Sequence, residues 1–488
     1  MTPPVTRRAA SGTPLLLLLA LALFAVPRLA MLTRYPPWQD ELWTLDVVQR
    51  DFPTMLRWVV ADQTHPPLFY ALAWAWRRVG PDALWWMRLL PALIGIGTAV
   101  PVVALCRAAR LGSRAAVTAV ALCAASPWLV FYSVELRDYG LYAALATASL
   151  AAWLRARDAE PLDRGPWRVL VVINIALVYS HYFGWLVIVA EGADALLAAR
   201  RRLVPFARST AWTALAFAPW AGLVVRRAVR FPRGLEMVSW IPRPVIGDFL
   251  DPYRSALGMS PWVGVDLALV VLAGGAIAWC VLRQRERPRE GGGAEDGNSP
   301  LIPLLLAATL PGVLTFAASL VGPRSMWVAR YLLAVAPPFL VLVAVAIAAG
   351  LPARKRVLAI VFALWPAALT AWHASRRDEK VAFDAIAREI GVRDAAVSGT
   401  PVYALDYTEG GPLAWIAARH APHLDVTTIA SVDSIRAPRA WVVWNEAMPP
   451  RGPTPTARLI RDGYRVEQEF FVRGMDDSVV VIAVRRAR

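Results

Sequence analysis

Charged residues and cysteine are both scarce in this chain of 488 residues. Only 18% of its residues are charged and 57% are hydrophobic. In soluble globular proteins about 25% of residues are charged and about 45–50% are apolar. The apolar residues come in long blocks, which excludes a soluble enzyme and a disordered chain. The three cysteines, Cys106, Cys123 and Cys280, all lie within apolar blocks. The sequence therefore predicts neither a disulfide framework nor a thiolate metal site.

Acidic residues are outnumbered, with 36 Asp and Glu against 52 Lys and Arg and a net charge of +16. Most of the cations are arginines in short connections between apolar blocks. A nucleic-acid-binding protein would instead carry a contiguous basic face. The distribution therefore argues against a nucleic-acid partner and indicates a polytopic membrane protein whose loops follow the positive-inside rule, with membrane lipids as partners.

A helix that spans a membrane needs about 20 apolar residues, and about eleven blocks are candidates. Arg7 and Arg8 precede the first block and no small-residue cleavage site follows them, so we interpret that block as a retained helix and not a signal peptide. The candidate spans are 14–33, 85–106, 115–133, 138–154, 167–180, 183–199, 209–226, 262–282, 301–321, 328–350 and 356–373.

The arginine-rich connections predict the orientation of the chain. With Arg7 and Arg8 in the cytoplasm, most of these connections fall inside. The block 167–199 is either one long helix or a tight pair broken at 181–184, and the choice reverses every later segment; the charges favour the pair. The N-terminus is then cytoplasmic and the C-terminal region extracytoplasmic. One external loop, 226–260, is rich in arginine, which indicates either phosphate binding or contact with anionic headgroups.

Three regions lack the long apolar run that a membrane-spanning helix needs. Segment 34–84 predicts two helices that lie on the membrane surface, one beginning near residue 41 and one over 67–79. Residues 283–299 form a charged, Gly-rich linker. The last region predicts a small soluble α/β domain, with a helix over 379–390 and strands over 396–405, 424–430, 440–445 and 478–485. We therefore expect a transmembrane body over 1–373 and an extracytoplasmic domain over 374–488.

Polar residues gather in five loops that the predicted topology places on one side of the membrane. Ionisable groups near membrane spans mark functional sites by default, because they are costly there. The residues are Asp40 and Glu41, then His65, then Glu135, Arg137 and Asp138, then His181 and Tyr182, and finally Arg330 and Tyr331. Their convergence is more informative than any one of them.

Each of these residues also has a structural explanation. Asp40 suits a helix N-cap, and adjacent helical residues point about 100° apart, so Asp40 and Glu41 cannot serve one site equally. His65 precedes two prolines and suits an exposed loop. Glu135 and Arg137 could form a structural ion pair. Arg330 and Tyr331 suit a headgroup anchor, while a guanidinium also matches the geometry of phosphate.

Five motifs resemble those of one known group of membrane enzymes. They are D-E after the first span, H-P-P-L-F-Y about 24 residues later, F-Y-S-V-E-L-R-D-Y, Y-S-H-Y-F-G and A-R-Y-L-L-A-V-A-P-P. Over roughly residues 14–350 their order and spacing resemble the GT-C glycosyltransferases, in particular the family 39 group of protein O-mannosyltransferases and the lipid A aminoarabinose transferase. The resemblance implies a GT-C-like helical body in the bacterial inner (plasma) membrane, with interfacial helices in its first external loop.

The resemblance also implies an activity: inverting transfer of a hexose or pentose from a polyprenyl-phosphate donor to a hydroxyl on a glycolipid, protein or envelope polymer. Asp40 carries over as the base, while Glu41 and Glu135 are further candidate catalytic carboxylates. Arg137, Tyr139 and Arg330 match positions near the donor phosphate, and His65, His181, Tyr182 and Tyr331 complete the predicted donor site. A phosphate ester already leaves well, so no metal is required, and whether a divalent ion assists stays open. A transporter or flippase of a lipid-linked or anionic substrate is the alternative.

Overall fold

The computed structural model describes residues 13–35, 37–160, 163–230, 241–258, 260–286, 299, 301–349, 356–375, 383–393, 399–445, 453–473 and 478–487. Arg7, Arg8 and most of the predicted linker 283–299 lie outside these residues. The chain divides into two compact units. The helical body comprises Met1–Ala30, Asp51–Pro81 and Trp86–Ala371, and the C-terminal unit comprises Met31–Arg50, Asp82–Trp85 and Trp372–Arg488.

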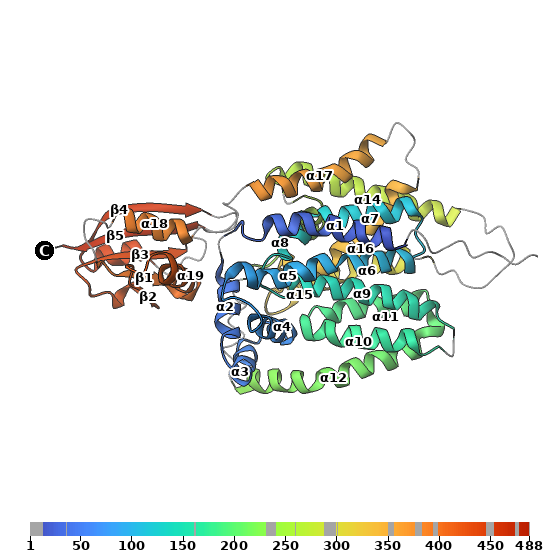
Figure 1. Cartoon of the computed structure of the whole chain (residues 1–488), viewed down its shortest axis with the longest axis horizontal. Coiled ribbons are helices and arrows are strands. Elements are labelled where there is room, and N and C mark those ends of the chain that lie inside the picture. The colour runs from blue at the N-terminus through green and yellow to red at the C-terminus, as the bar shows by residue number, and fades with distance from the viewer. Residues whose placement is uncertain are drawn as a thin grey trace, which may run out of the picture. The chain divides into compact units, whose positions relative to one another are not determined.

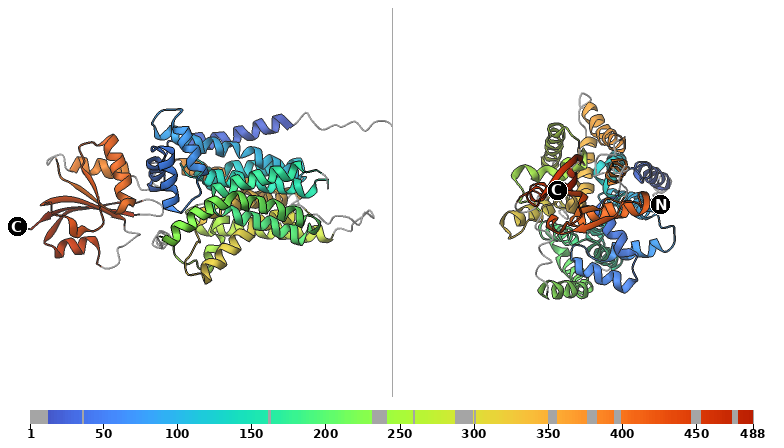
Figure 2. Two further views of the ribbon diagram at one scale, coloured as in Figure 1. Left: turned by 90° about the horizontal axis from the view of Figure 1, so that it is seen from below. Right: turned by 90° about the vertical axis from the view of Figure 1, so that its left-hand side faces the viewer.

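Long α-helices that run alongside one another make up the helical body (Figures 1 and 2). The helices that lie wholly or mainly in it are α1 (Thr13–Met31), α3 (Phe52–Asp62), α4 (Leu68–Arg77), α5 (Leu84–Gly97), α6 (Ala99–Ala108), α7 (Ser113–Ala125), α8 (Pro127–Tyr132), α9 (Tyr139–Asp158), α10 (Gly165–Ser180), α11 (Gly184–Leu197), α12 (Leu203–Arg230), α13 (Asp251–Leu257), α14 (Val263–Glu286), α15 (Leu301–Val321), α16 (Ala336–Ala348) and α17 (Arg356–Ser375), with the 3₁₀ turns η1 (Arg200–Arg202), η3 (Ile246–Leu250) and η4 (Ala329–Val335).

Each of the eleven predicted spans falls on one of these helices or on two consecutive ones. Among the described residues, four helical stretches are long and apolar enough to cross a membrane. They are Leu84–Ala108, Val263–Leu282, Leu301–Val321 and Ala329–Ala348. That all eleven cross the bilayer stays a prediction, because several of the other helices are shorter or more polar.

The block 167–199 is two helices, α10 and α11, which meet at His181. The turn is tight because Gly184 has no side chain. A Cβ on Gly184 would lie 2.8 Å from Leu177 Cγ and 3.1 Å from its carbonyl oxygen. A similar close approach brings Gly140 at the start of α9 against Ser133, whose Cα lies 3.3 Å from an ideal Cβ. Both glycines therefore allow a close approach at the ends of consecutive helices.

Three helices, and not two, follow α1. They are α2 (Gln39–Val48), α3 and α4. Helix α3 was not predicted; Asp51 caps it by accepting the amide of Thr54 at 2.9 Å, and Pro53 occupies its first turn. Helix α2 belongs to the C-terminal unit and begins before residue 41. Glu41 bonds the first turn, because its carboxylate accepts the amide of the N-cap residue Trp38 at 3.4 Å. Asp40 lies inside the helix and not at the N-cap position that the capping alternative gave it.

The C-terminal unit is built on a five-stranded mixed sheet of order β2-β1-β3-β5-β4. Strand β1 pairs in parallel with β2 and β3, whereas β3–β5 and β4–β5 are antiparallel. Apolar side chains of α18 and α19 cover one face, and those of η6 and α20 the other; the left view of Figure 2 shows helices on both faces. The elements are α18 (Phe383–Arg393), β1 (Val402–Leu405), α19 (Asp406–His420), β2 (Val426–Ile429), η6 (Val432–Ser434), β3 (Arg439–Asn445), α20 (Pro455–Arg461), β4 (Tyr464–Arg473) and β5 (Ser478–Arg486).

The expected small α/β domain is therefore present, with α19, α20 and β4 as elements that the sequence did not predict. Residues 379–382 of the predicted helix and 396–398 of the first predicted strand lie outside the described residues. Helix α2 packs against α19 within the same unit. The acidic pair Asp40–Glu41 is thus carried by an element of the C-terminal unit.

Candidate active site

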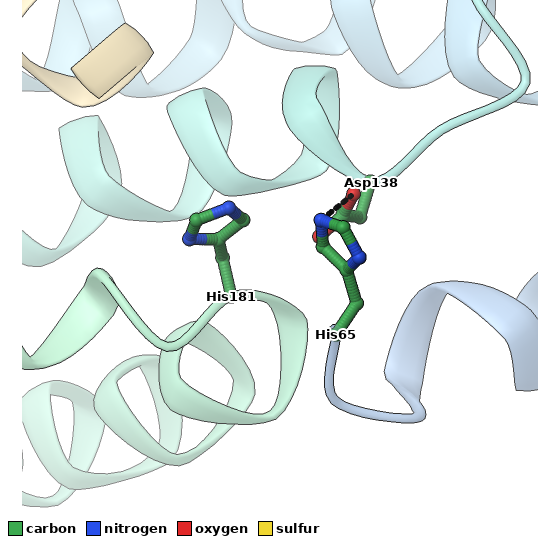
Figure 3. A group of neighbouring side chains, drawn as sticks. All are labelled: His65, Asp138 and His181. Carbon is green, nitrogen blue, oxygen red and sulfur yellow. Dashed lines mark ion pairs between the residues drawn. The ribbon is translucent and has the colours of Figure 1, made fainter. Parts of the chain in front are cut away.

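Four loops of the helical body bring polar and aromatic side chains together. They are the loop before α4, the turn between α8 and α9, the turn between α10 and α11, and η4. Figure 3 shows His65, Asp138 and His181, from three of these loops, next to one another. We call the group made of His65, Arg137, Asp138, Tyr139, His181, Arg330 and Tyr331 the polar cluster.

Arg137 ties two of the loops together. Its Nη1 donates to the hydroxyl of Tyr70 on α4, and its Nη2 lies 3.1 Å from Nδ1 of His65. The Arg137 side chain is almost fully buried, with 4% of its surface exposed. A guanidinium in such a place requires hydrogen-bonding partners, because burial of a charge without them is costly.

The two histidines lie in contact with each other and with tyrosine rings. The ring centroids of His65 and His181 are 5.5 Å apart, and Tyr331 lies 6.2 Å from the first and 5.5 Å from the second. Burial and the positive charge of Arg137 hold the pKa of His65 well below its ordinary value. The same two causes lower the pKa of His181 to about 3. Both imidazoles are therefore neutral at physiological pH.

Arg330 joins the polar cluster from η4. Its Nε donates to the hydroxyl of Tyr139 at 3.1 Å, and the rings of Tyr139 and Tyr331 stack with centroids 6.5 Å apart. Arg330 is half-buried. Its guanidinium has the planar fork geometry that matches a phosphate or carboxylate.

The remaining predicted residues lie elsewhere or are only partly placed. Tyr182 turns to α12, where its hydroxyl accepts from Trp220 Nε1 at 3.2 Å, and it takes no part in the polar cluster. Glu135, which lies two residues before Arg137, is buried. The backbone amide of Arg137 donates to the carbonyl oxygen of Glu135 at 2.7 Å. Asp40 and Glu41 lie in the C-terminal unit, half-buried and fully buried respectively.

The sequence places Asp138 among the converging polar residues without giving it a role, and it does not single out Tyr70 or Tyr142, which contact the polar cluster. Asp138 lies with its Oδ1 3.7 Å from His65 Nε2. Tyr70 stands at the end of the H-P-P-L-F-Y motif, which was the available signal for it. Tyr142 follows Asp138 by one helical turn, so it shares a helix face with it, and it stacks on His181 with centroids 4.5 Å apart.

His65, Asp138 and His181 are residue types that bind zinc, and their ligand atoms lie within 4.8 Å of one another. A histidine that ligates a metal through one ring nitrogen carries its proton on the other and donates it outward. Nδ1 of His181 does the reverse, because it accepts the amide of Phe183 at 3.1 Å. Nδ1 of His65 faces Arg137, which has only donors. In this arrangement the three residues do not fit a metal ion.

No protein-family model matches the chain, and no curated protein matches it. Among solved structures, the chain is similar to apo ArnT from Cupriavidus metallidurans, with 17% identity and a TM-score of 0.54 over 96% of this chain and 97% of that one. The form of ArnT bound to undecaprenyl phosphate has 16% identity and a TM-score of 0.51, over 97% of this chain and 98% of that one. The Archaeoglobus fulgidus oligosaccharyltransferase in complex with zinc and sulfate has 17% identity and a TM-score of 0.53, over 88% of this chain and 68% of that one.

ArnT and the oligosaccharyltransferase are both glycosyltransferases of the GT-C fold. The similarity to ArnT extends over nearly the whole of both chains, so it includes the C-terminal unit as well as the helical body. At this level of identity, the similarity establishes the fold. The chain therefore has the GT-C fold, as its five sequence motifs predict.

Proposed function

We propose that the chain is an inverting glycosyltransferase that moves a sugar from a polyprenyl-phosphate donor to a hydroxyl acceptor on the outer face of the plasma membrane. The observation that carries the proposal is the polar cluster, in which loops of a GT-C body bury Arg137 and hold Arg330 beside histidines and tyrosines. A structure of the same fold is bound to undecaprenyl phosphate, which supports this choice of donor. The N-terminus is cytoplasmic in this proposal and the C-terminal unit extracytoplasmic.

The chemistry is a single displacement. The acceptor oxygen attacks the anomeric carbon, the bond from that carbon to the phosphate oxygen breaks, and polyprenyl phosphate leaves with the electron pair. The acceptor proton passes to a carboxylate, a step that general-base catalysis accelerates by about 10²–10⁴-fold. Because one displacement occurs at one carbon, the anomeric configuration inverts.

The residues have distinct roles in this mechanism. Asp40 is the base, Glu41 supports α2 through its bond to Trp38, and Glu135 orients the reacting groups. Arg330 and Arg137 stabilise the negative charge that grows on the phosphate, since preorganised cations act strongly in a site that excludes water. The acceptor is a glycolipid, a protein or an envelope polymer, and the sugar is a hexose or pentose.

Purified protein in lipid nanodiscs tests this function. It is incubated with polyprenyl-phosphate sugars and with an extract of envelope glycolipids and proteins, and products are followed by mass spectrometry. We expect release of polyprenyl phosphate together with a sugar on a new acceptor. Full activity of the Asp40→Asn protein would remove Asp40 from the role of base.

The alternative, a transporter or flippase, rests on buried charges within the helical body. Arg157 on α9 lies 3.1 Å from Asp194 on α11, and Glu191 lies 2.6 Å from Ser149. Intramembrane charges of this kind also mark substrate or ion pathways. Movement of a fluorescent polyprenyl-phosphate sugar between the leaflets of a proteoliposome, with no sugar transferred, would favour this alternative.

A further inference from the structure

Two buried donor groups in and beside the polar cluster lack a partner within the described part of the chain. Nε2 of His65 makes no hydrogen bond there, and its nearest acidic atom, Asp138 Oδ1, is 3.7 Å away. The hydroxyl of Tyr142, which stacks on His181, is also without a partner among the described residues. His181 accepts the amide of Phe183 through its Nδ1 at 3.1 Å. Buried polar groups in proteins are nearly always satisfied, so this pattern points to a ligand.

The hydrogen bonds at Nδ1 decide where each imidazole carries its proton. The amide of Phe183 can only donate, so Nδ1 of His181 accepts and the proton of the neutral ring is on Nε2. Nδ1 of His65 has two neighbours, Arg137 Nη2 at 3.1 Å and Thr64 Oγ1 at 3.0 Å. The Thr64 hydroxyl donates to Asp62 Oδ2, so the donor that faces Nδ1 is Arg137. An unprotonated Nδ1 accepts from Arg137, whereas a protonated one would oppose the guanidinium. Both histidines therefore present Nε2–H.

The charge of the polar cluster indicates the sign of the ligand. Arg137 and Arg330 contribute two positive charges and Asp138 one negative charge, and the two histidines are neutral. A divalent cation would raise the net charge of the polar cluster from +1 to +3, which is unfavourable in a buried place. A phosphate monoester carries about −1.5 to −2 and would nearly neutralise the group. An oxyanion also accepts hydrogen bonds from Nε2–H and from a tyrosine hydroxyl.

We propose, resting on the function proposed above, that His65 and His181 bind a phosphate oxyanion as neutral donors through Nε2–H, and that Arg137 acts as a positioning residue that holds His65 in this tautomer. The oxyanion is the phosphate of the lipid carrier or a free phosphate, which share the same acceptor chemistry. The site takes no metal ion. Recognition of phosphate thus depends on two uncharged imidazoles as well as on the guanidinium groups.

Matched substitutions separate this role from metal binding. The amide nitrogen of Gln reaches about as far as Nε2, and that of Asn about as far as Nδ1. We expect H65Q and H181Q to bind undecaprenyl phosphate in nanodiscs within about threefold of wild type, and H65N and H181N to bind it about 10- to 100-fold more weakly, the range for a hydrogen bond to a charged group. EDTA should change nothing. Inorganic phosphate is the second probe, and competition by it identifies the free ion as an accepted source.

Two outcomes would overturn the inference. One is equal loss in the Gln and Asn variants, with binding abolished by EDTA and restored by zinc chloride, which is the behaviour of a metal site. The other is unchanged binding in all four variants. If the distinction between Gln and Asn is lost while sugar transfer persists, the inference fails and the proposed function stands. If the Gln and Asn variants still differ but wild type transfers no sugar, the inference stands and the proposed function fails.

A measurement on the wild-type protein covers the case in which the Asn variants do not fold. The chain has five histidines, so ¹⁵N-histidine labelling gives few signals, and H65Q and H181Q assign two of them. We expect unprotonated Nδ1 and protonated Nε2 for both residues, and a rise in the Nδ1–H form of His65 in R137Q. A protonated Nδ1 on either residue in wild type would contradict the proposal.

Discussion

The Nε–H of Arg330 donates to the hydroxyl of Tyr139 at 3.1 Å, which joins η4 to the first residue of α9. A long arginine side chain loses conformational entropy when it is held in one geometry. This bond fixes the direction of the guanidinium before substrate arrives, so part of the ordering cost of binding is already met in the free protein. Arg330 is in this way preorganised beside the two histidines.

Substitution of Arg330 should therefore reduce sugar transfer strongly. We expect R330K to lower kcat/KM by about 10²-fold, because Lys keeps the charge and loses the planar fork. Y139F is the matched comparison, since it keeps the ring and removes the hydroxyl that accepts from Arg330; a loss of a few-fold, mainly in KM, is expected. Initial rates over a range of donor concentrations measure both. Equal effects of R330K and Y139F would contradict a role for Arg330 at the phosphate.

Asp40 and Glu41 should respond differently to substitution by their amides. D40N removes the proposed base and should lower kcat by at least about 10²-fold. In E41Q the side-chain oxygen can still accept the amide of Trp38, so we expect activity within a few-fold of wild type. Single-turnover rates and melting temperatures are compared. The assignment fails if D40N is as active as E41Q.

The low pKa of His181, about 3, makes the stability of the protein depend on pH. Below about pH 6.5 the unfolded chain protonates this histidine while the folded one does not, so stability is complete above pH 6.5 and falls as the pH is lowered towards 3. At pH 5 the loss is about 2 kcal/mol for His181. Burial and the positive charge of Arg137 cause the low pKa of His181. The other groups that face the ring include Asp138, His65, Tyr142 and Tyr331.

The measurement is the melting temperature of detergent-solubilised protein at pH 7.5 and pH 5.0, for wild type and H181Q. H181Q should be less stable at pH 7.5 but should lose less stability on acidification. The comparison cancels the other titrating groups, which both proteins share. An identical decrease in the two proteins would show that His181 is not held neutral by the fold.

Gly184 tests the tight turn that places His181. An alanine there would bring Cβ to 2.8 Å from Leu177 Cγ and 3.1 Å from its carbonyl oxygen, and such overpacking costs about 1–3 kcal/mol. Gly222 on α12 is the control, since a Cβ there meets nothing within 4 Å. G222A should stabilise the helix by about 0.5–1 kcal/mol. Thermal unfolding of the two variants should therefore change in opposite directions, and a stable G184A would contradict the packing described for this turn.

The sequence predicted the helical body well because long apolar runs end at prolines, glycines and charges. The run 301–321 coincides with α15, and the break predicted at 181–184 is the junction of α10 and α11. Helix α3 was not predicted, because a helix of eleven residues with mixed polarity gives no span signal. Short elements whose polarity is mixed depend on their tertiary contacts.

The unpredicted elements of the C-terminal unit have local causes. Helix α19 contains Gly410, Gly411 and Pro412, residues that ordinarily indicate a turn. Strand β4 carries an irregularity in its pairing with β5 between Val466 and Gln468. A bulge of this kind shifts the alternation of inward and outward side chains, which is the pattern that identifies a strand in a sequence.

The sequence predicted that loops with polar residues converge, and it did not predict the contacts within the polar cluster. The motifs identified His65, Arg137, His181 and Arg330, because ionisable residues stand out between apolar blocks. Their contacts join segments far apart in the chain, and the position of the proton on His181 depends on one backbone amide, that of Phe183. A sequence records neither of these.

The most direct test of the proposed function is an anomeric analysis of the reaction product. Purified wild-type protein in nanodiscs receives a polyprenyl-phosphate sugar of known anomeric configuration and an envelope acceptor extract, with D40N and R330K in parallel. The mechanism predicts that wild type releases polyprenyl phosphate and forms a glycoside of inverted configuration, and that both variants do so at least about 10²-fold more slowly. A product of retained configuration, or an intact donor that has only moved between leaflets, would contradict it.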